Sequence, residues 1–581
     1  MTQSFRAEES DIFTGGKMLT ELVLLRSALQ AAPLPLDLPG ASILRHQREQ
    51  VIDQLEDYVI PRLMSLEAPL LTVVGGSTGA GKSTLVNTLV GQRVTAPGVL
   101  RPTTRSPVLA HHPDDAHWFG PDRLLPDLKR VSHSTDDPDS IQLVASPNVP
   151  KGLAILDAPD VDSVEEQNRI LAGQLLAAAD LWLFVTSAAR YADQVPWEYL
   201  KQAAERSTAV ALVLDRTPPD AVQTVSAHLA RMMAARGLKD SPLFGVAEGP
   251  ISEEGLLPAG HVAEIRTWLD ALAADAAARE QIVHQTVGGA IRMMTRMVYP
   301  LADAAADQVA ALGDLNLLVE KQFSIVTAGL AQAATDGSLM RGELLAKWQE
   351  FVGSGELLSS LEAKVGFVRD RLVNAIKGKP QQAERVWVAV ETALETLAVE
   401  HGEQVAARTA GAWRVTQYGA QLLDAAATDL SRASRDLRRR AASEVKAWED
   451  ELQELIRRES GEVRTTTRFL AFGVRGLAVC LAIVTLAGDR TPPMAVESAL
   501  LGRKTLETVL GAPTTASLVE RARASLDRRL ATLLSGERDR YLAPADHWQL
   551  RPEAAEQLRE AARRVDDLRY AATKKGTGGH L

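Results

Sequence analysis

The segment Val73–Thr84, VVGGSTGAGKST, constrains the fold more than any other stretch of this chain. Its Gly-x-x-x-x-Gly-Lys-Ser spacing is that of a phosphate-binding P-loop, with an apolar run (LLTVV) before it and a helical run (STLVNTLVG) after it. The backbone N–H groups of such a loop, and the N-terminus of the helix that follows, bind phosphate oxygens. The sequence therefore predicts a nucleotide-binding loop made of Gly76, Ser77, Thr78, Gly79, Ala80, Gly81, Lys82, Ser83 and Thr84.

Apolar runs alternate with helical stretches around this loop. Between about 69 and 250, the runs LLTVVGG, SPVLAHH, LAILDAP, LWLFVTS, AVALVLD and LFGVAEG are separated by amphipathic segments. Apolar strands connected by helices indicate an α/β domain with a mostly parallel sheet that is covered on both faces. From about 262 to 460 we find no convincing strand, and long segments rich in Ala, Leu, Glu and Arg predict a helical bundle or stalk.

The composition limits what else the chain contains. Its 581 residues predict about three or four structural units. Cys480 is the only cysteine, which excludes a disulfide framework and a cysteine-based zinc site and fits a reducing cytosol. The N-terminal sequence lacks the apolar core of a signal peptide, so we expect none. The formal net charge of −10 argues against nucleic-acid binding by the whole chain, and no DNA partner is expected.

The helix after the P-loop, GKSTLVNTLVG, resembles the GKSTLxNxLxG run of translation-factor-related GTPases, the Era-like and dynamin-like proteins. This resemblance implies GTP or GDP and Mg²⁺ as ligands. In LRPTTRSPVL it assigns Mg²⁺ binding through a mobile switch loop to Thr104, with Thr103 as the less favoured candidate. In LAILDAPD it assigns the water shell of Mg²⁺ to Asp157. Lys82 on the β- and γ-phosphates and Ser83 on Mg²⁺ complete the expected catalytic set.

The segment ALVLDRTPPD lies where these GTPases carry their base-reading motif, N/T-KxD. Asp215 and Arg216 occupy the Asn/Thr and Lys positions, so we expect them to contribute to nucleotide binding. Pro218 replaces the Asp that reads guanine, and Asp220 is nearby but off register. The motif alone therefore leaves the base open, while the resemblance favours GTP.

Two more positions depart from the family pattern. Asp160 replaces the usual Gly of the DxxG motif, and its carboxylate would repel the γ-phosphate unless it turns away. Thr78 stands where dynamin-like enzymes commonly carry a Gln, so hydrolysis is expected to be slow without self-association or a partner. Lys82→Ala should abolish nucleotide binding, and Thr78→Ala should alter turnover only.

The most apolar window of the chain is 469–488, FLAFGVRGLAVCLAIVTLAG, with Arg475 inside it. A second, amphipathic segment covers 494 to about 512, and Val496, Leu500, Leu506 and Leu510 are predicted near one face of it. One interpretation is a membrane-interacting hairpin that binds anionic lipids through about 464–512, because Arg457, Arg458, Arg464 and Arg468 precede it. The other is a hairpin buried inside the helical bundle, with Arg475 salt-bridged.

This order of segments resembles a bacterial dynamin-like protein. The resemblance implies N-terminal helices that pack with the stalk (1–66), a GTPase domain (67–260), a helical stalk (261–460), a membrane-interacting hairpin (461–515), a returning stalk helix (516–572) and a disordered tail (573–581). It also implies a homo-oligomer, or assembly with a close paralogue, attached to the inner face of the cell membrane. Two alternatives stay open: a soluble Era-like regulatory GTPase, and a nucleotide-binding scaffold with little hydrolysis.

Overall fold

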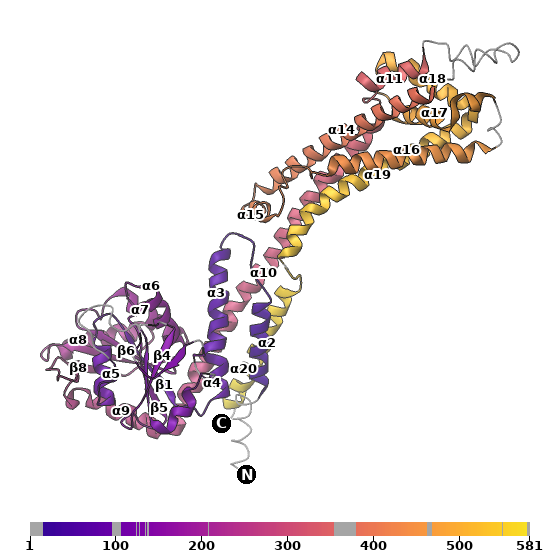
Figure 1. Cartoon of the computed structure of the whole chain (residues 1–581). Coiled ribbons are helices and arrows are strands. Elements are labelled where there is room, and N and C mark those ends of the chain that lie inside the picture. The colour runs from indigo at the N-terminus through magenta and orange to yellow at the C-terminus, as the bar shows by residue number, and fades with distance from the viewer. Residues whose placement is uncertain are drawn as a thin grey trace. The chain divides into compact units, whose positions relative to one another are not determined.

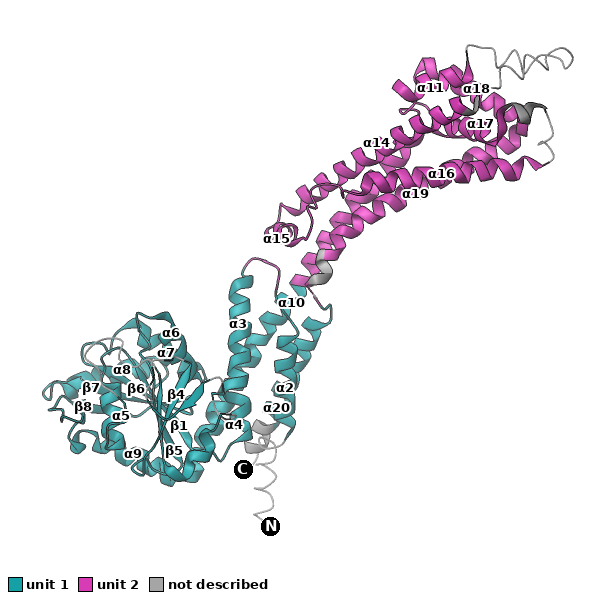
Figure 2. Cartoon of the chain, viewed as in Figure 1, with its two compact units in different colours: residues 1–34, 40–307, 551–581 teal, residues 35–39, 308–550 magenta. Residues whose placement is uncertain are grey.

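The computed structural model describes residues 16–95, 106–353, 379–461 and 467–577, apart from 122, 124, 127, 134, 136, 138, 207 and 549. The chain divides into two compact units (Figure 2). Unit 1 contains residues 1–34, 40–307 and 551–581, and unit 2 contains residues 35–39 and 308–550. The predicted boundaries at 260 and 460 do not coincide with this division, because the first helices of the expected stalk belong to unit 1.

Unit 1 is built around one eight-stranded sheet with the order β3-β4-β2-β5-β1-β6-β7-β8 (Figure 1). All neighbouring strands are parallel except β2 and β5, which pair antiparallel, so the sheet is mostly parallel as predicted. Its strands are β1 (Leu70–Gly76), β2 (Val108–His111), β3 (Lys129–Val131), β4 (Ser140–Ala145), β5 (Leu153–Asp157), β6 (Leu181–Ser187), β7 (Ala209–Thr217) and β8 (Leu243–Ala247).

Helices cover both faces of this sheet (Figure 1). They are α5 (Lys82–Val90), α6 (Glu166–Ala177), α7 (Gln194–Arg206), α8 (Val222–Ala235) and α9 (Ala263–Ala274), with short 3₁₀ turns η2 (Pro113–Phe119) and η3 (Ala259–Val262). The central strands β1, β5 and β6 are buried along their whole length, which explains their continuous apolar sequence. The sequence analysis missed β3 and β4, since these strands are short or polar and lie partly exposed at the end of the sheet.

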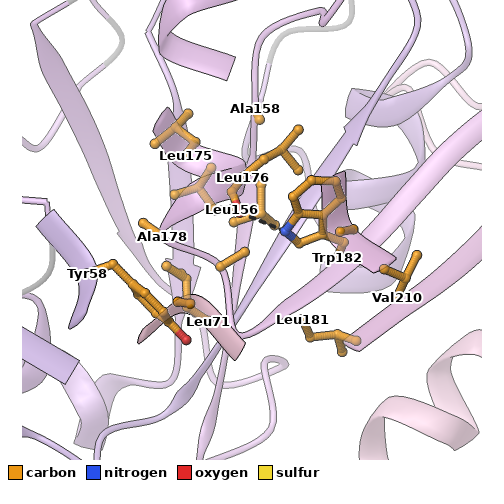
Figure 3. Packing of buried hydrophobic residues seen from close by; sticks show 14 of the residues in the cluster. Tyr58, Leu71, Leu156, Ala158, Leu175, Leu176, Ala178, Leu181, Trp182 and Val210 are labelled. Carbon is orange, nitrogen blue, oxygen red and sulfur yellow. Dashed lines mark hydrogen bonds between the residues drawn. The ribbon is translucent and has the colours of Figure 1, made fainter. Parts of the chain in front are cut away.

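The N-terminal helices complete the core of unit 1. They are α2 (Gly16–Gln30), α3 (Ala41–Gln54), the π-helical turn η1 (Leu55–Val59) and α4 (Ile60–Met64); α2 packs on α20 (Ala554–Thr577). Figure 3 shows the buried Trp182, whose Nε1 donates to the Leu176 carbonyl at 2.7 Å. Arg62 and Tyr58 both donate to the buried Asp180 at 3.0 Å, which fixes these helices against the start of β6.

Unit 2 is entirely helical in its described residues (Figure 1). The long helix α10 (Ala276–Thr335) contributes to both units, and its part from Gln308 onward belongs to unit 2. The other helices are α11 (Gly342–Val352), α14 (Lys379–Trp413), α15 (Gln417–Ala425), α16 (Leu437–Glu459), α17 (Thr467–Leu486), α18 (Pro493–Leu510) and α19 (Ala512–His547). Their core contains the buried indoles of Trp348, Trp387, Trp413 and Trp448.

The apolar window in α17 is part of this core, which corrects the expectation that it faces a membrane. Leu477 and Ile483 are both fully buried, as are the apolar residues between them. Arg475 forms ion pairs with Glu384 and with Glu449, the latter at 3.4 Å. The alternative of a buried hairpin with a salt-bridged arginine therefore describes α17. Packing of its apolar side chains against tryptophan-rich neighbours removes them from water, which lowers the free energy of the folded chain.

The amphipathic helix α18 also packs differently from the prediction. Val496 and Leu500 are exposed, whereas Leu506 is buried, so they do not share one face. Besides Leu506 and Val509, the buried face contains the small residues Ala495, Ser498, Ala499, Gly502 and Thr505. A Cβ at Gly502 would lie 3.0 Å from the Trp348 ring, so small side chains let α18 approach its neighbours closely.

The C-terminal segment also differs from the expected single helix over 516–572. It forms two helices in different units, α19 and α20, separated around residues 548–553. Helix α20 extends to Thr577, and the rest of the expected tail, 578–581, lies outside the described residues. Across the described helices, no stretch combines the length and the apolar character needed to cross a bilayer.

Candidate functional site

The predicted P-loop connects the end of β1 to the start of α5. At Gly76 the backbone φ is 145°, and an ideal Cβ there would lie 2.0 Å from the Val185 carbonyl oxygen on β6. At Gly81 the φ is 105°, and a Cβ would lie 2.1 Å from a carboxylate oxygen of Asp215. Only glycine fits these two positions without displacing its neighbours. The loop thus has the tight turn into a helix N-terminus that binds phosphate in P-loop proteins.

Lys82 points back into this loop. Its ammonium donates to the carbonyl oxygens of Gly76 and Ser77, each at 3.1 Å, and forms an ion pair with Asp160. The Lys82 side chain is 6% exposed and that of Asp160 is 13% exposed, so the pair is largely shielded from water. Asp160, which replaces the usual glycine of the DxxG motif, is therefore paired with Lys82, the cation that is expected to bind the phosphates.

Asp157, the last residue of β5, lies opposite the start of α5. Its Oδ2 accepts hydrogen bonds from the Ser83 hydroxyl at 2.7 Å and from the Thr95 hydroxyl at 2.9 Å. Its Oδ1 is buried and has no hydrogen-bond partner among the described residues. Burial raises the pKa of Asp157, although the hydrogen bond from Ser83 and the charge of Lys82 act to lower it. An unpartnered carboxylate oxygen in a buried site is a group that a cation would stabilise.

The oxygen donors around Asp157 fit Mg²⁺. Hard cations prefer carboxylate and hydroxyl oxygens, and Mg²⁺ usually takes one or two protein ligands together with phosphate oxygens and water. Ser83 and Asp157 supply such a set. No group of three or more His, Cys, Asp or Glu side chains suited to a metal occurs within the described part of the chain.

Thr95 is a residue of this site that the sequence analysis missed. Asn87, on α5, holds it in place: its Oδ1 accepts from Val94 N at 2.8 Å and Thr95 N at 3.0 Å, and its Nδ2 donates to Thr95 O at 2.9 Å. The feature of the sequence that could have indicated Thr95 is the polar Asn87 among the apolar residues of the GKSTLVNTLVG run. Thr103 and Thr104, the predicted switch-loop residues, lie outside the described residues.

A second carboxylate, also missed, contacts the P-loop from the segment after β5. Asp162 Oδ1 accepts from the backbone N–H of Thr78 at 2.5 Å and from the Thr78 hydroxyl at 2.7 Å. The other oxygen, Oδ2, forms an ion pair with Arg190, in the loop after β6. Asp160 and Asp162, two carboxylates of one segment, thus bind P-loop groups that would also bind a phosphate: the Lys82 ammonium and the Thr78 N–H.

The structure brings Asp215 to the P-loop together with Arg216, whose Nε would lie 3.6 Å from an ideal Cβ at Gly81. Asp215 is buried beside Gly81 and accepts from the Arg216 N–H at 2.7 Å. Burial raises its pKa from 3.8 to about 6, more than the Arg216 hydrogen bond and charge lower it. Arg216 itself is exposed, with a φ of 50°. Pro218 and Asp220 lie exposed in the turn before α8.

Comparisons with known proteins match part of this domain to a family model. Residues 72–215, which include the P-loop, Asp157 and Asp215, match the family model described as the Dynamin family. No curated protein matches the chain. Two chains from solved structures of an oligomerised bacterial dynamin pair, described as a mechanism for long-range sensing and tethering of membranes, are similar to it. They are 10% and 13% identical with TM-scores of 0.37 and 0.26; the first alignment covers 91% of each chain, and the second covers 72% of this chain and 80% of the other. At so distant a similarity, only the family match bears on function.

Proposed function

We propose that this chain, a dynamin-like GTPase whose residues 72–215 belong to the dynamin family, couples Mg²⁺-dependent hydrolysis of GTP to contact with an anionic membrane surface. Members of this family hydrolyse GTP, which assigns the reaction. The observation that carries the proposal is the convergence of Lys82, Ser83 and Asp157 at one P-loop inside the matched region.

Each residue of the P-loop site has a role in this proposal. The backbone N–H groups of the loop and the ammonium of Lys82 bind the β- and γ-phosphates. Ser83 binds Mg²⁺ directly and Asp157 binds it through water, while Thr104 adds a further ligand. Asp215 and Arg216 lie on the side of the base. Bound Mg²⁺ would neutralise charge on the phosphate oxygens.

Thr78 occupies the position at which a water-orienting group is expected, and its hydroxyl is engaged by Asp162 at 2.7 Å. A threonine hydroxyl at this position does not replace the amide of the Gln that such enzymes commonly carry. We therefore expect slow turnover by the isolated chain and faster turnover when a second copy, or a close paralogue, completes the site.

Membrane contact in this proposal uses the exposed face of α18. Val496 and Leu500 are 41% and 55% exposed, and Arg503 and Lys504 lie on the same side of the helix. An exposed apolar strip beside basic residues suits the interface of an anionic bilayer. Arg464 and Arg468 belong to a segment whose side chains lie outside the described residues. The proposal includes peripheral attachment to the inner face of the cell membrane.

The burial of α17 favours a second candidate, a regulatory GTPase of the Era-like class that acts without a membrane. With Leu477 and Ile483 buried in the core, the most apolar segment of the chain is not accessible to lipid in this conformation. The two candidates share the GTPase site and differ only in what the helices contact.

Sedimentation with liposomes separates these candidates. The full chain would be mixed with vesicles of phosphatidylcholine alone or with about one third phosphatidylglycerol, with GTP, GDP or no nucleotide. The variant Val496→Asp/Leu500→Asp changes only exposed side chains, and Leu317→Asp, which changes another exposed leucine of unit 2, is the control. We expect sedimentation with the anionic vesicles that the double variant loses and the control keeps. Sedimentation by neither the wild type nor the control would leave the regulatory GTPase.

A further inference from the structure

The carboxylate of Asp162 bridges the P-loop and an arginine that no motif predicts. One oxygen accepts the Thr78 N–H, and the other pairs with Arg190 Nη1, so the guanidinium lies two hydrogen bonds from the loop through a single side chain. Asp162 is 15% exposed and Arg190 is 37% exposed. The carboxylate is therefore largely shielded, while the guanidinium has room to move.

The backbone around Arg190 is well defined. Strand β6 is paired with β1 up to Gly76 and Val185, so the loop after β6 begins next to the P-loop. In this loop the Arg190 N–H donates to the Ser187 carbonyl at 2.9 Å, and the Arg190 carbonyl accepts from Asp193 N at 3.0 Å. A turn fixed at the carboxyl edge of a parallel sheet presents its side chains to the ligand of the P-loop.

A bound triphosphate competes directly with Asp162. The Thr78 N–H is one of the donors that a P-loop offers to phosphate oxygens, and it donates to Asp162 at 2.5 Å. A carboxylate and the γ-phosphate repel each other at such short range, so Asp162 must turn away when GTP binds. Its partner Arg190 then faces the phosphate in place of the carboxylate.

We propose that Arg190 is a further phosphate-contacting residue of this GTPase. Its guanidinium is positioned by the ion pair with Asp162, and it binds the γ-phosphate instead when GTP displaces that carboxylate. The inference rests on the proposed function. Thr78 stands where the family commonly carries a catalytic Gln, and an arginine from the same chain would supply another means of catalysis, because it stabilises the charge of the transition state. The guanidinium suits this task because its planar donors match phosphate oxygens in pairs.

The reaction that Arg190 would assist is balanced without another reactant. A water oxygen bonds to the γ-phosphorus, the bond from that phosphorus to the β–γ bridging oxygen breaks, and the proton of the water passes to solvent. The products are GDP and inorganic phosphate. Negative charge grows on the bridging oxygen as this bond breaks, and a guanidinium near it lowers the barrier.

The test compares Arg190→Ala and Arg190→Lys with Arg559→Ala in the full chain. Arg559 is the control: it lies in unit 1, is 39% exposed, and pairs with Asp303 at 2.7 Å and with Glu556 at 3.9 Å, away from the P-loop. Single-turnover GTP hydrolysis and the affinities for GDP and a non-hydrolysable GTP analogue would be measured with Mg²⁺. We expect Arg190→Ala to slow hydrolysis at least 30-fold (an estimate of about 2 kcal/mol). It should weaken the analogue about fivefold and leave GDP within about twofold.

The Lys variant should recover part of the rate, because a point charge replaces the planar donors, and Arg559→Ala should match the wild type. Hydrolysis by Arg190→Ala within about twofold of the wild type would overturn the inference. So would equal weakening of GDP and analogue with a lower melting temperature, because that pattern belongs to a structural ion pair. A wild-type chain that binds neither nucleotide would instead refute the proposed function, so the two failures are distinguishable.

Discussion

The ion pair between Lys82 and Asp160 leads to the sharpest prediction for the nucleotide site. A phosphate can reach the Lys82 ammonium only if the Asp160 carboxylate leaves it. Asp160→Asn keeps the shape of the side chain and removes the charge. We expect this variant to bind a non-hydrolysable GTP analogue more tightly than the wild type, because the analogue no longer displaces an anion from a shielded site.

The size of this effect follows from the burial of the pair. Two unit charges about 5 Å apart interact by about 3 kcal/mol at an effective dielectric constant near 20. The repulsion between Asp160 and the γ-phosphate has this order if the carboxylate stays, and part of it disappears as the segment moves. A remaining gain of about 1.4 kcal/mol gives a tenfold higher affinity for the analogue. GDP lacks the γ-phosphate, so its affinity should change less than about threefold.

Isothermal titration of the full chain with GDP and the analogue, with Mg²⁺, measures both quantities. Asp240→Asn is the control, since Asp240 is exposed and precedes β8 at the sheet edge opposite the P-loop. The buried Lys82 loses its partner in Asp160→Asn, so the melting temperature without nucleotide should fall and nucleotide should restore it. An analogue affinity equal to that of the wild type, or weaker, would refute the reasoning.

Three further predictions concern Asp215, Gly81 and Ile483. Burial raises the pKa of Asp215 from 3.8 to about 6. Between these two values the folded protein binds a proton on Asp215 that the unfolded chain releases. The contribution of this group to the free energy of unfolding therefore falls as pH rises through about 4 to 6. Asp215→Asn should remove that pH dependence in chemical denaturation and stabilise the protein at pH 7.5 by up to about 3 kcal/mol; equal pH profiles would contradict this. Gly81→Ala should abolish nucleotide binding in titration, because its Cβ would lie 2.1 Å from the Asp215 carboxylate, whereas Gly120→Ala, with nothing within 4 Å, should bind normally. Ile483→Asp should cost more than about 4 kcal/mol of unfolding free energy, because it places a charge in the core of unit 2; a folded variant of unchanged stability would mean that α17 is not buried.

The sequence predicted those parts of the site that depend on neighbours along the chain. A P-loop is a local pattern, since Gly76 and Gly81 are needed by the backbone of the loop itself. Asp157 was assigned through the resemblance of LAILDAPD to the DxxG motif, and its Oδ2 lies 2.7 Å from the Ser83 hydroxyl. The alternation of apolar runs and helices was enough to indicate the central strands of the sheet.

Contacts between distant segments were beyond the sequence. Nothing local distinguishes Asp162 or Arg190 from other surface charges, and they meet only because β5 and β6 flank β1 in the sheet. The apolar run of α17 is equally compatible with lipid and with a protein core, since both remove it from water. Its burial depended on Trp348 and other core residues contributed by helices far along the chain.

The central claim is that Lys82 and its P-loop bind GTP for hydrolysis with Mg²⁺. The most direct test is the rate of phosphate release by the full chain from GTP, with ATP and GTP without Mg²⁺ as comparisons, for the wild type and Lys82→Ala. We expect turnover of GTP that requires Mg²⁺, little turnover of ATP, and none by the variant. Equal turnover of ATP, or a Lys82→Ala variant as active as the wild type, would contradict the account.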